Sequence, residues 1–378
     1  METLFTNARI VTRNDVVRGS LVVKNGRILE IDDMRSSGVK TIDLQDDLLL
    51  PGLIEIHTDN LEKNILPRPG VLWPSMLASA LAHDVQIAGA GITTVFDAIA
   101  IGGLREGGLD SRILKESIAA IVRGQALNLF KADHRLHLRC DVADKQMESH
   151  LSTYGVHPLV NLISVMDHTP GQRQWTDLEK WRLYHRDKKW TDPEAERIRL
   201  GCLDMQRIYG KRNRVIAVQF ARDRKIPLAS HDDTTAIDAL SAAADGIAIS
   251  EFPTTLIAAK AARNHGMRIV MGAPNVVRGG SHSGNISAGE LAKQELLDGL
   301  SSDYVPASLL HSAFYLSDVL SIPLPKTVAM ISANVADMTG LDDRGEIAVG
   351  KRADLIRVTW IDDLPVIRKV WREGQPIC

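Results

Sequence analysis

The chain has 378 residues, of which 44% are hydrophobic and 24% are charged, and its formal net charge is −2. This composition is ordinary for a globular protein and excludes a collagen-like, coiled-coil or disordered chain. The near-neutral charge argues against binding to nucleic acid or to an anionic membrane surface. The three cysteines lie far apart and indicate neither a disulfide framework nor a thiolate zinc cluster. Because no secretory signal or membrane-length apolar run is evident, we expect a cytoplasmic protein.

Both ends of the chain are predicted to be rich in β-strands. Strand-like patterns occur in residues 4–12, 20–23, 27–31, 354–360 and 366–371. Asn25-Gly26 is typical of a hairpin turn, and Asp362-Asp363 marks a second turn. The economical arrangement is one small β-sandwich built from residues 1–50 and 341–378.

Between these ends, short apolar runs alternate with helical periodicity. The runs predict eight strands, at residues 53–56, 92–96, 136–140, 159–166, 227–230, 246–250, 267–271 and 300–304. Helical patterns separate them, for example at residues 75–88, 111–126, 195–209, 254–265 and 289–297. Eight strand–helix units favour a closed barrel, and the absence of a GxGxxG motif after the first strand disfavours an open doubly wound sheet. The predicted fold class is α/β, a (β/α)₈ TIM-like barrel over residues 51–340.

Polar residues follow most of the predicted barrel strands, at the face where this fold keeps its active site. His57 and Asp59 end the first strand, and their i, i+2 spacing puts both side chains on one side of an extended segment. The later strands are followed by Asp141, Asp167, His168, His231, Asp232, Asp233, Glu251 and Asp303. Imidazoles and carboxylates together suit Zn²⁺, with Mn²⁺ or Fe²⁺ as alternatives, and one or two ions per chain. The sequence therefore predicts a divalent-metal centre.

Each of these residues, taken alone, is more often a helix cap or a loop stabiliser than a metal ligand. Their joint occurrence after six strands favours the cluster, because capping does not require histidine. Asp303 is a candidate general base, with an N-cap role as its alternative. For Glu251 two roles are equally favoured, that of a site residue and that of a residue in the turn that enters a helix at Thr254. For His83, inside a helical stretch, a helix-surface or helix-dipole role is favoured over metal ligation.

A glycine-rich segment over residues 272–285 follows the seventh strand and is full of hydrogen-bond donors. Phosphate sites near strands seven and eight are common in this fold, so the segment is predicted to bind an anion. The alternative is a flexible lid or an ordinary loop. Two further arginines, Arg173 and Arg68, could join the same pocket. The candidate phosphate-binding residues of the segment are Arg278, Ser281, His282, Ser283 and Asn285.

Several long stretches make the chain resemble a known family over essentially its full length. These stretches are residues 57–63, 133–140, 166–174, 229–233 and 271–285. They resemble the PhnM family of the amidohydrolase superfamily, the α-D-ribose 1-methylphosphonate 5-triphosphate diphosphatases of the carbon–phosphorus lyase pathway of phosphonate degradation. The resemblance implies hydrolysis of that triphosphate to the 5-phosphate and pyrophosphate.

The resemblance also implies roles for individual residues. The implied metal ligands are His57, Asp59, His168, His231 and Asp303, with Asp141 as a further ligand. From their positions at strand ends, we expect His231 and Asp303 to be the catalytic residues. Asp167 remains an additional candidate. The family usually has Cys-Glu where this chain has Cys140-Asp141, and this departure shortens the reach of that carboxylate.

Two other functions stay open at this point. The superfamily hydrolyses C–N bonds on the same metal platform, so a deacetylase or a cyclic amidase is the alternative, and a metal-free scaffold is a third reading. The donor-rich loop favours a small phosphorylated ribose over an uncharged amide. We expect no nucleic-acid or membrane partner, and the sequence leaves a homo-oligomeric state open.

Overall fold

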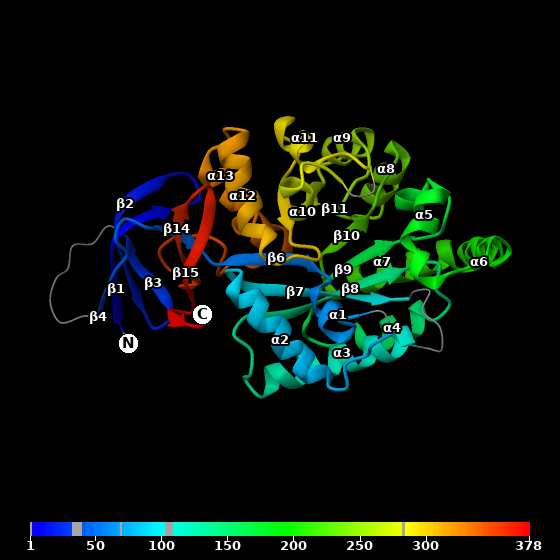
Figure 1. Cartoon of the computed structure of the whole chain (residues 1–378), viewed down its shortest axis with the longest axis horizontal. Coiled ribbons are helices and arrows are strands. Elements are labelled where there is room, and N and C mark those ends of the chain that lie inside the picture. Colours follow the sequence, from blue (N-terminus) through cyan, green and yellow to red (C-terminus); the bar gives the residue numbers. More distant parts are fainter. Residues whose placement is uncertain (1, 32–39, 69, 103–108, 282–283) are drawn as a thin grey trace.

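The computed structural model describes residues 2–31, 40–68, 70–102, 109–281 and 284–378. It contains two β-sheets, of which one forms a helix-covered barrel and the other lies beside it (Figure 1). The second sheet combines strands from the two ends of the chain, drawn in blue and red. The predicted fold class is confirmed.

The barrel consists of eight parallel strands that neighbour one another in chain order. They are β6 (Leu53–Thr58), β7 (Ile92–Ile101), β8 (Asp133–Asp141), β9 (Val160–Met166), β10 (Leu228–His231), β11 (Ile249–Glu251), β12 (Arg268–Gly272) and β13 (Gly299–Ser301). Each overlaps one predicted run. The barrel closes just beyond β13, where the Asp303 N–H donates to the His57 carbonyl at 3.2 Å and the Asp59 N–H donates to the Asp303 carbonyl at 2.9 Å. Closure thus brings together residues that the sequence assigned to the site.

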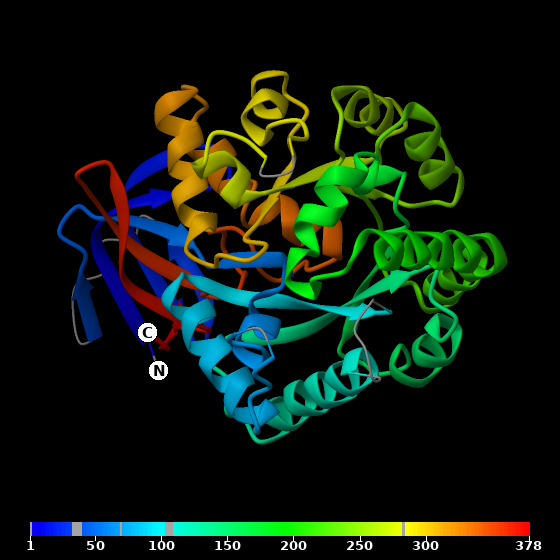
Figure 2. The ribbon, with the colours of Figure 1, turned by 45° about the vertical axis from the view of Figure 1, so that its right-hand side comes forward.

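Helices surround the barrel strands (Figure 2). They are α1 (Asn60–Ile65), α2 (Met76–Gly89), α3 (Leu109–Ala126), α4 (Met147–Tyr154), α5 (Leu178–Tyr184), α6 (Asp192–Met205), α7 (Lys211–Arg224), α8 (Ala236–Ala244), α9 (Leu256–Asn264), α10 (Ala273–Val277), α11 (Ala288–Lys293), α12 (Ser308–Val319), α13 (Leu324–Ala329) and α14 (Ala333–Thr339). Short 3₁₀ turns, η2 (Arg173–Trp175) and η3 (Arg186–Lys188), flank α5, and a π-helical turn, η4 (Gln206–Gly210), joins α6 to α7. Several starts follow from capping: Ser75, Thr255 and Ser287 each accept a hydrogen bond from a first-turn N–H.

One part of the predicted anion loop is helical instead. Residues 273–277 form α10, whose first turn tolerates Pro274 because the N–H groups there have no partner within the helix. The irregular part of the segment begins at Arg278, the C-terminal cap of α10. The loop expectation was therefore wrong for the first half of this segment.

The second sheet contains the strands β1 (Glu2–Val11), β2 (Val16–Lys24), β3 (Arg27–Ile31), β4 (Lys40–Asp43), β5 (Leu48–Pro51), β14 (Leu355–Ile361), β15 (Leu364–Arg372) and β16 (Gln375–Pro376). Antiparallel pairing of β5 with β14 joins the two ends of the chain. Positive φ angles at Asn25 and Gly26, and again at Asp362 and Asp363, suit the tight hairpins predicted there. We propose the limits 1–50 plus 341–378 for this domain, because β6 starts the barrel at Leu53 and α14 ends at Thr339.

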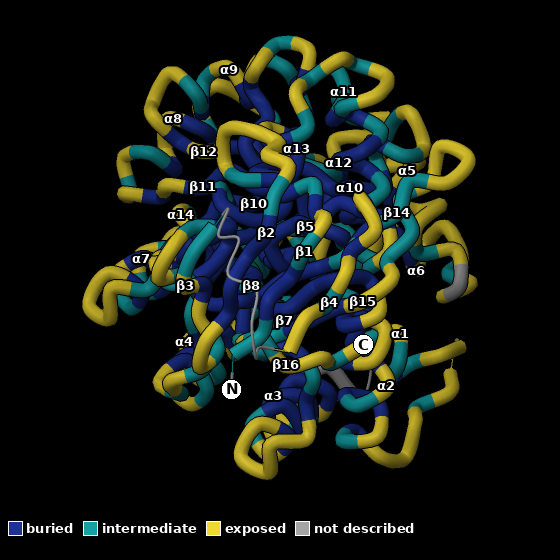
Figure 3. Tube along the Cα trace, turned by 90° about the vertical axis from the view of Figure 1, so that its left-hand side faces the viewer, coloured by how far each residue is buried: buried dark blue, intermediate teal, exposed yellow. Residues whose placement is uncertain are grey.

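Separate apolar clusters support the two parts. Phe5 packs edge-on against Trp371 in the small domain, with ring centroids 5.1 Å apart. Inside the barrel, a layer that includes Ile54, Phe96 and Val270 is fully buried. Figure 3 shows the buried strands beneath exposed helix ends and loops. Since the apolar layer is placed before the ends of its strands, the polar residues at those ends lie above it. No helix in the described part of the chain is long and apolar enough to span a membrane.

Candidate metal centre

Histidines from three barrel strands surround one fully buried carboxylate, that of Glu251. Its Oε1 lies 3.3 Å from Nδ1 of His57, and its Oε2 lies 3.4 Å from Nδ1 of His231 and 4.0 Å from Nε2 of His137. The positions follow from the sheet, because His231 and Glu251 are register partners on β10 and β11. A carboxylate at Nδ1 holds the proton there and leaves the Nε2 lone pair available to a metal. Glu251, left open by the sequence, thus belongs to the cluster.

The Nε2 atoms face a second set of carboxylates. Nε2 of His57 lies 4.0 Å from Oδ1 of Asp59. Nε2 of His231 and Nε2 of His168 lie 3.4 Å and 4.0 Å from the same oxygen, Oδ2 of Asp232. That oxygen is buried and has no hydrogen-bond partner. The sequence placed Asp232 at a strand end but omitted it from the expected ligands, although its position beside His231 was the available signal.

Asp303 reaches the same region through the closure of the barrel. Glu55 fixes this closure: its buried carboxylate accepts the N–H groups of His57 and Ser302, both at 2.6 Å. A Cβ added to Gly272 would lie 3.6 Å from Oδ2 of Asp303, so this carboxylate approaches the end of β12. Asp303 and Asp232 both have positive φ, at 51° and 56°, a strained conformation that is concentrated at functional sites in proteins.

The site holds more negative charge than its own cations balance. Burial and the neighbouring Asp59 raise the pKa of Asp303 to about 7, and burial raises the pKa of Asp232 to about 6. Burial, with the Arg139 guanidinium, lowers the pKa of His57 to about 3. Arg139 donates to Oδ1 of Asp59 at 2.8 Å and is largely, though not fully, buried near the end of β8. Sequence reasoning missed Arg139, because a strand arginine flanked by apolar residues carries no motif.

These features fit a divalent cation. The unpartnered Asp232 oxygen, the imidazoles held neutral by burial and the crowded carboxylates are all groups that a cation would stabilise. The chain therefore has a His and Asp cluster able to hold a metal, as the sequence predicted. The ligand set itself, including His57, Asp59, His168, His231 and Asp303, stays a prediction, and we add Asp232 to it.

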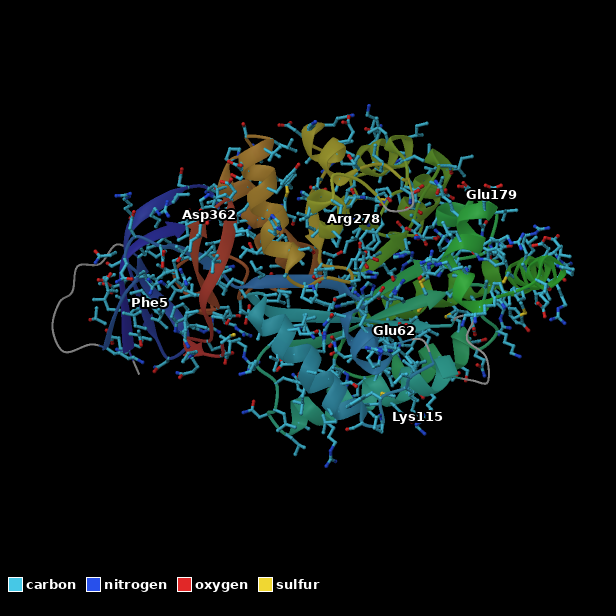
Figure 4. The ribbon with its side chains drawn as sticks, viewed as in Figure 1. Phe5, Glu62, Lys115, Glu179, Arg278 and Asp362 are labelled. Atoms are coloured by element: carbon cyan, nitrogen blue, oxygen red, sulfur yellow. The ribbon has the colours of Figure 1, made fainter. Side chains whose placement is uncertain are left out.

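Exchange of Glu251 for glutamine tests how the histidines are oriented. A glutamine can accept from one Nδ1–H but presents an NH₂ to the other, so we expect Glu251→Gln to lower metal affinity by about 10- to 100-fold. Metal per chain, measured against a graded chelator, checks this. Glu179→Gln on exposed α5 (Figure 4) is the matched control and should bind metal like the original chain. Equal affinities in both variants would contradict the orienting role.

Two other carboxylates at strand ends accept hydrogen bonds from the local backbone. Oδ1 of Asp141 accepts the Ala143 N–H at 3.1 Å, and Oδ1 of Asp167 accepts the Thr169 N–H at 3.1 Å. Asp141 also lies 3.4 Å from Nδ1 of His168, so it contacts a candidate ligand through its other oxygen. The capping alternative therefore describes Asp167 well and Asp141 in part.

The candidate phosphate-binding residues are dispersed. The guanidinium of Arg173 donates to Oδ1 of Asp233 at 2.8 Å and to the His231 carbonyl at 2.9 Å, so it braces the end of β10. Arg278 is exposed after α10 (Figure 4) and contacts the Tyr304 hydroxyl at 3.4 Å. Arg68 is exposed on the loop after α1, and Ser281 and Asn285 are half-buried. His282 and Ser283 lie outside the described residues.

A second buried cluster shares no residue with these ligands. Nε2 of His83 is 2.8 Å from Oδ1 of Asp97, Nδ1 of His134 is 2.8 Å from Oδ2 of Asp97, and Nε2 of His134 is 3.1 Å from Oδ1 of Asp84. The amide of Asn60 donates to Nδ1 of His83 at 2.9 Å. The helix-surface role favoured for His83 is therefore wrong: α2 turns this imidazole inward, where it is fully buried.

Comparison with known proteins decides the family. No protein-family model matches the chain. The chain is 44% identical over 377 residues, covering 99% of it and 100% of the relative, to α-D-ribose 1-methylphosphonate 5-triphosphate diphosphatase of Escherichia coli K12. The chain belongs to the α-D-ribose 1-methylphosphonate 5-triphosphate diphosphatase family. Membership of this family makes the chain a hydrolase.

Solved structures agree on the fold of this diphosphatase family. N-acetylglucosamine-6-phosphate deacetylase of Pasteurella multocida is similar with a TM-score of 0.65 at 15% identity, covering 100% of this chain and 99% of that one. 5-methylcytosine deaminase of Klebsiella pneumoniae gives 0.66 at 12% identity, covering 100% and 97%. At these identities the likeness concerns the amidohydrolase fold alone.

Proposed function

We propose that the chain hydrolyses α-D-ribose 1-methylphosphonate 5-triphosphate to the 5-phosphate and pyrophosphate, within carbon–phosphorus bond degradation. The observation that carries the proposal is 44% identity to a diphosphatase over 99% of the chain, together with a histidine and aspartate cluster at the barrel mouth. An exposed arginine on the loop after β12 offers charge to a phosphorylated substrate.

The proposed metal ligands are His57, Asp59, His168, His231, Asp232 and Asp303. Zn²⁺ is our first choice, because imidazole nitrogen and carboxylate oxygen form its usual catalytic sets. A bound divalent cation neutralises phosphoryl oxygens and makes water a better nucleophile. Ion number stays a prediction, as do a cytoplasmic location and a homo-oligomeric state.

The protein's own residues supply position and proton transfer. Glu251 holds the rings of His57 and His231 with their Nε2 atoms toward the substrate side. Arg139 holds Asp59 through its carboxylate. We assign to Asp303, just beyond β13, the acceptance of a proton from the attacking water at its carboxylate.

Product analysis separates this function from C–N hydrolysis. The metal-loaded protein should release pyrophosphate from the ribosyl triphosphate, and it should release neither ammonia nor acid from deacetylase and cyclic-amidase substrates. Amide turnover without pyrophosphate release would overturn the proposal. A metal-free protein without either activity would instead support the scaffold reading.

Loss of Arg278 should affect binding and spare the metal. We expect Arg278→Ala to raise the KM for the triphosphate by about 10-fold or more, since a charge-assisted hydrogen bond contributes about 1.5–3 kcal/mol. Metal per chain should not change, because Arg278 contacts the phenol of Tyr304 rather than a candidate ligand. Steady-state kinetics and elemental analysis check the two parts, and equal metal loss in Arg278→Ala and a ligand variant would contradict the division.

A further inference from the structure

The segment beyond Asp303 joins two exposed cations to one tyrosine. Lys63 on α1 donates through Nζ to the Tyr304 carbonyl at 2.6 Å, and the same ammonium lies 4.8 Å from the centroid of the Tyr304 ring. From another loop, Nη1 of Arg278 lies 3.4 Å from the Tyr304 hydroxyl. Tyr304 is thus contacted at its backbone, its ring and its hydroxyl by cations that follow β6 and β12.

These cations lack the anionic partners that surface cations commonly have. In the part of the chain that the structure describes, neither Lys63 nor Arg278 forms an ion pair with a carboxylate. Both residues are exposed, so a ligand can reach them. Two like charges gathered on one aromatic residue repel each other, and a bound anion would relieve that repulsion.

The pair of cations lies close to the candidate metal ligands in the chain. Tyr304 follows Asp303 directly, so its Cα lies about 3.8 Å from that of a proposed ligand. Lys63 is four residues beyond Asp59 and belongs to the helix that Asp59 precedes. An anion held by Lys63 and Arg278 therefore lies next to the metal centre.

We propose that Lys63, Arg278 and the Tyr304 hydroxyl form a subsite for the pyrophosphate part of a polyphosphate substrate. This inference rests on the proposed function for the identity of the substrate. The phosphorus nearest the sugar lies at the metal centre, and the two outer phosphoryl groups extend over Tyr304 toward Lys63 and Arg278. Lys63 and Tyr304 are additions to the sequence-derived candidates, which placed the anion on the loop after β12 with Arg173 and Arg68 as further contributors.

The test is the binding of inorganic pyrophosphate to the metal-loaded protein, measured by calorimetry, with metal content checked after each titration. We expect Lys63→Gln and Arg278→Gln each to weaken pyrophosphate binding by about 10-fold, since each removes one charge-assisted contact. Lys63→Arg keeps the charge and should restore most of the affinity. Tyr304→Phe should weaken binding by a smaller factor. Lys115→Gln, at an exposed position of α3 (Figure 4), is the matched control and should leave affinity unchanged.

The outcomes separate the subsite from the proposed function. Weaker pyrophosphate binding in both glutamine variants, with unchanged metal content and thermal unfolding midpoint, supports the subsite even if the ribosyl triphosphate is not hydrolysed. If Lys63→Gln and Arg278→Gln bind pyrophosphate as tightly as the original chain, the subsite is overturned, even if the triphosphate is hydrolysed. Equal weakening in Lys115→Gln also overturns it, because the effect would then reflect overall charge.

Discussion

Replacement of His231 by alanine should abolish turnover and remove metal. His231 stands at the centre of the candidate site, with Nδ1 3.4 Å from Glu251 and Nε2 3.4 Å from the unpartnered oxygen of Asp232. Its loss removes a nitrogen donor and leaves both carboxylates without their imidazole. Because metal catalysis contributes several kcal/mol and 1.4 kcal/mol is tenfold in rate, we expect kcat to fall by about 10³-fold or more.

Two measurements check this expectation, the initial rate of pyrophosphate release and the metal content of the purified protein. His265→Ala is the matched control, because His265 is an exposed imidazole at the C-terminal end of α9. It should keep the original rate and metal content. A His231→Ala protein that retains its metal and most of its rate would remove His231 from the centre.

The sequence predicted the barrel well because its strands combine apolar runs with a regular spacing. Every predicted run overlaps a strand, since burial favours apolar and small residues in these strands. The strands β4, β5 and β16 were missed, because they are short and depend on pairing with β1, β14 and β15 rather than on their own pattern. The π-helical turn after α6 was missed for a related reason, since it does not change the periodicity that predicts a helix.

The candidate site was predictable where a residue ends a strand and has a ligand's chemistry. His57, His168 and His231 meet those conditions and lie together in the structure. The role of Glu251 was ambiguous, because the end of its strand and the start of the next helix lie close together in the sequence. Arg139 and Glu55 were not predictable, because their roles depend on distant partners, Asp59 for one and Ser302 for the other.

Replacement of His134 by glutamine should destabilise the fold without removing metal. Burial opposes charge on this imidazole, but Asp97 and Asp84 raise its pKa to about 9, so it is an imidazolium between two carboxylates. The pKa of Asp97 is lowered to about 2, because His134 and His83 together outweigh its burial. A neutral glutamine cannot compensate both carboxylates, and breaking a buried pair costs about 3–5 kcal/mol in the free energy of unfolding.

The effect of His134→Gln should depend on pH with a definite sign. The folded pKa of about 9 exceeds the ordinary value of 6.5, so the stabilisation is fully present below pH 6.5 and is lost as the pH rises through 9. Asp97 contributes in the opposite sense only as the pH falls below 3.8 toward 2, outside this window. Denaturant unfolding with a chelator present, at pH 6 and pH 9, should show a gap between the original chain and His134→Gln that shrinks at the higher pH. A gap that is constant across this range would mean that His134 packs as a neutral ring, in contact with Phe130, rather than as an ion.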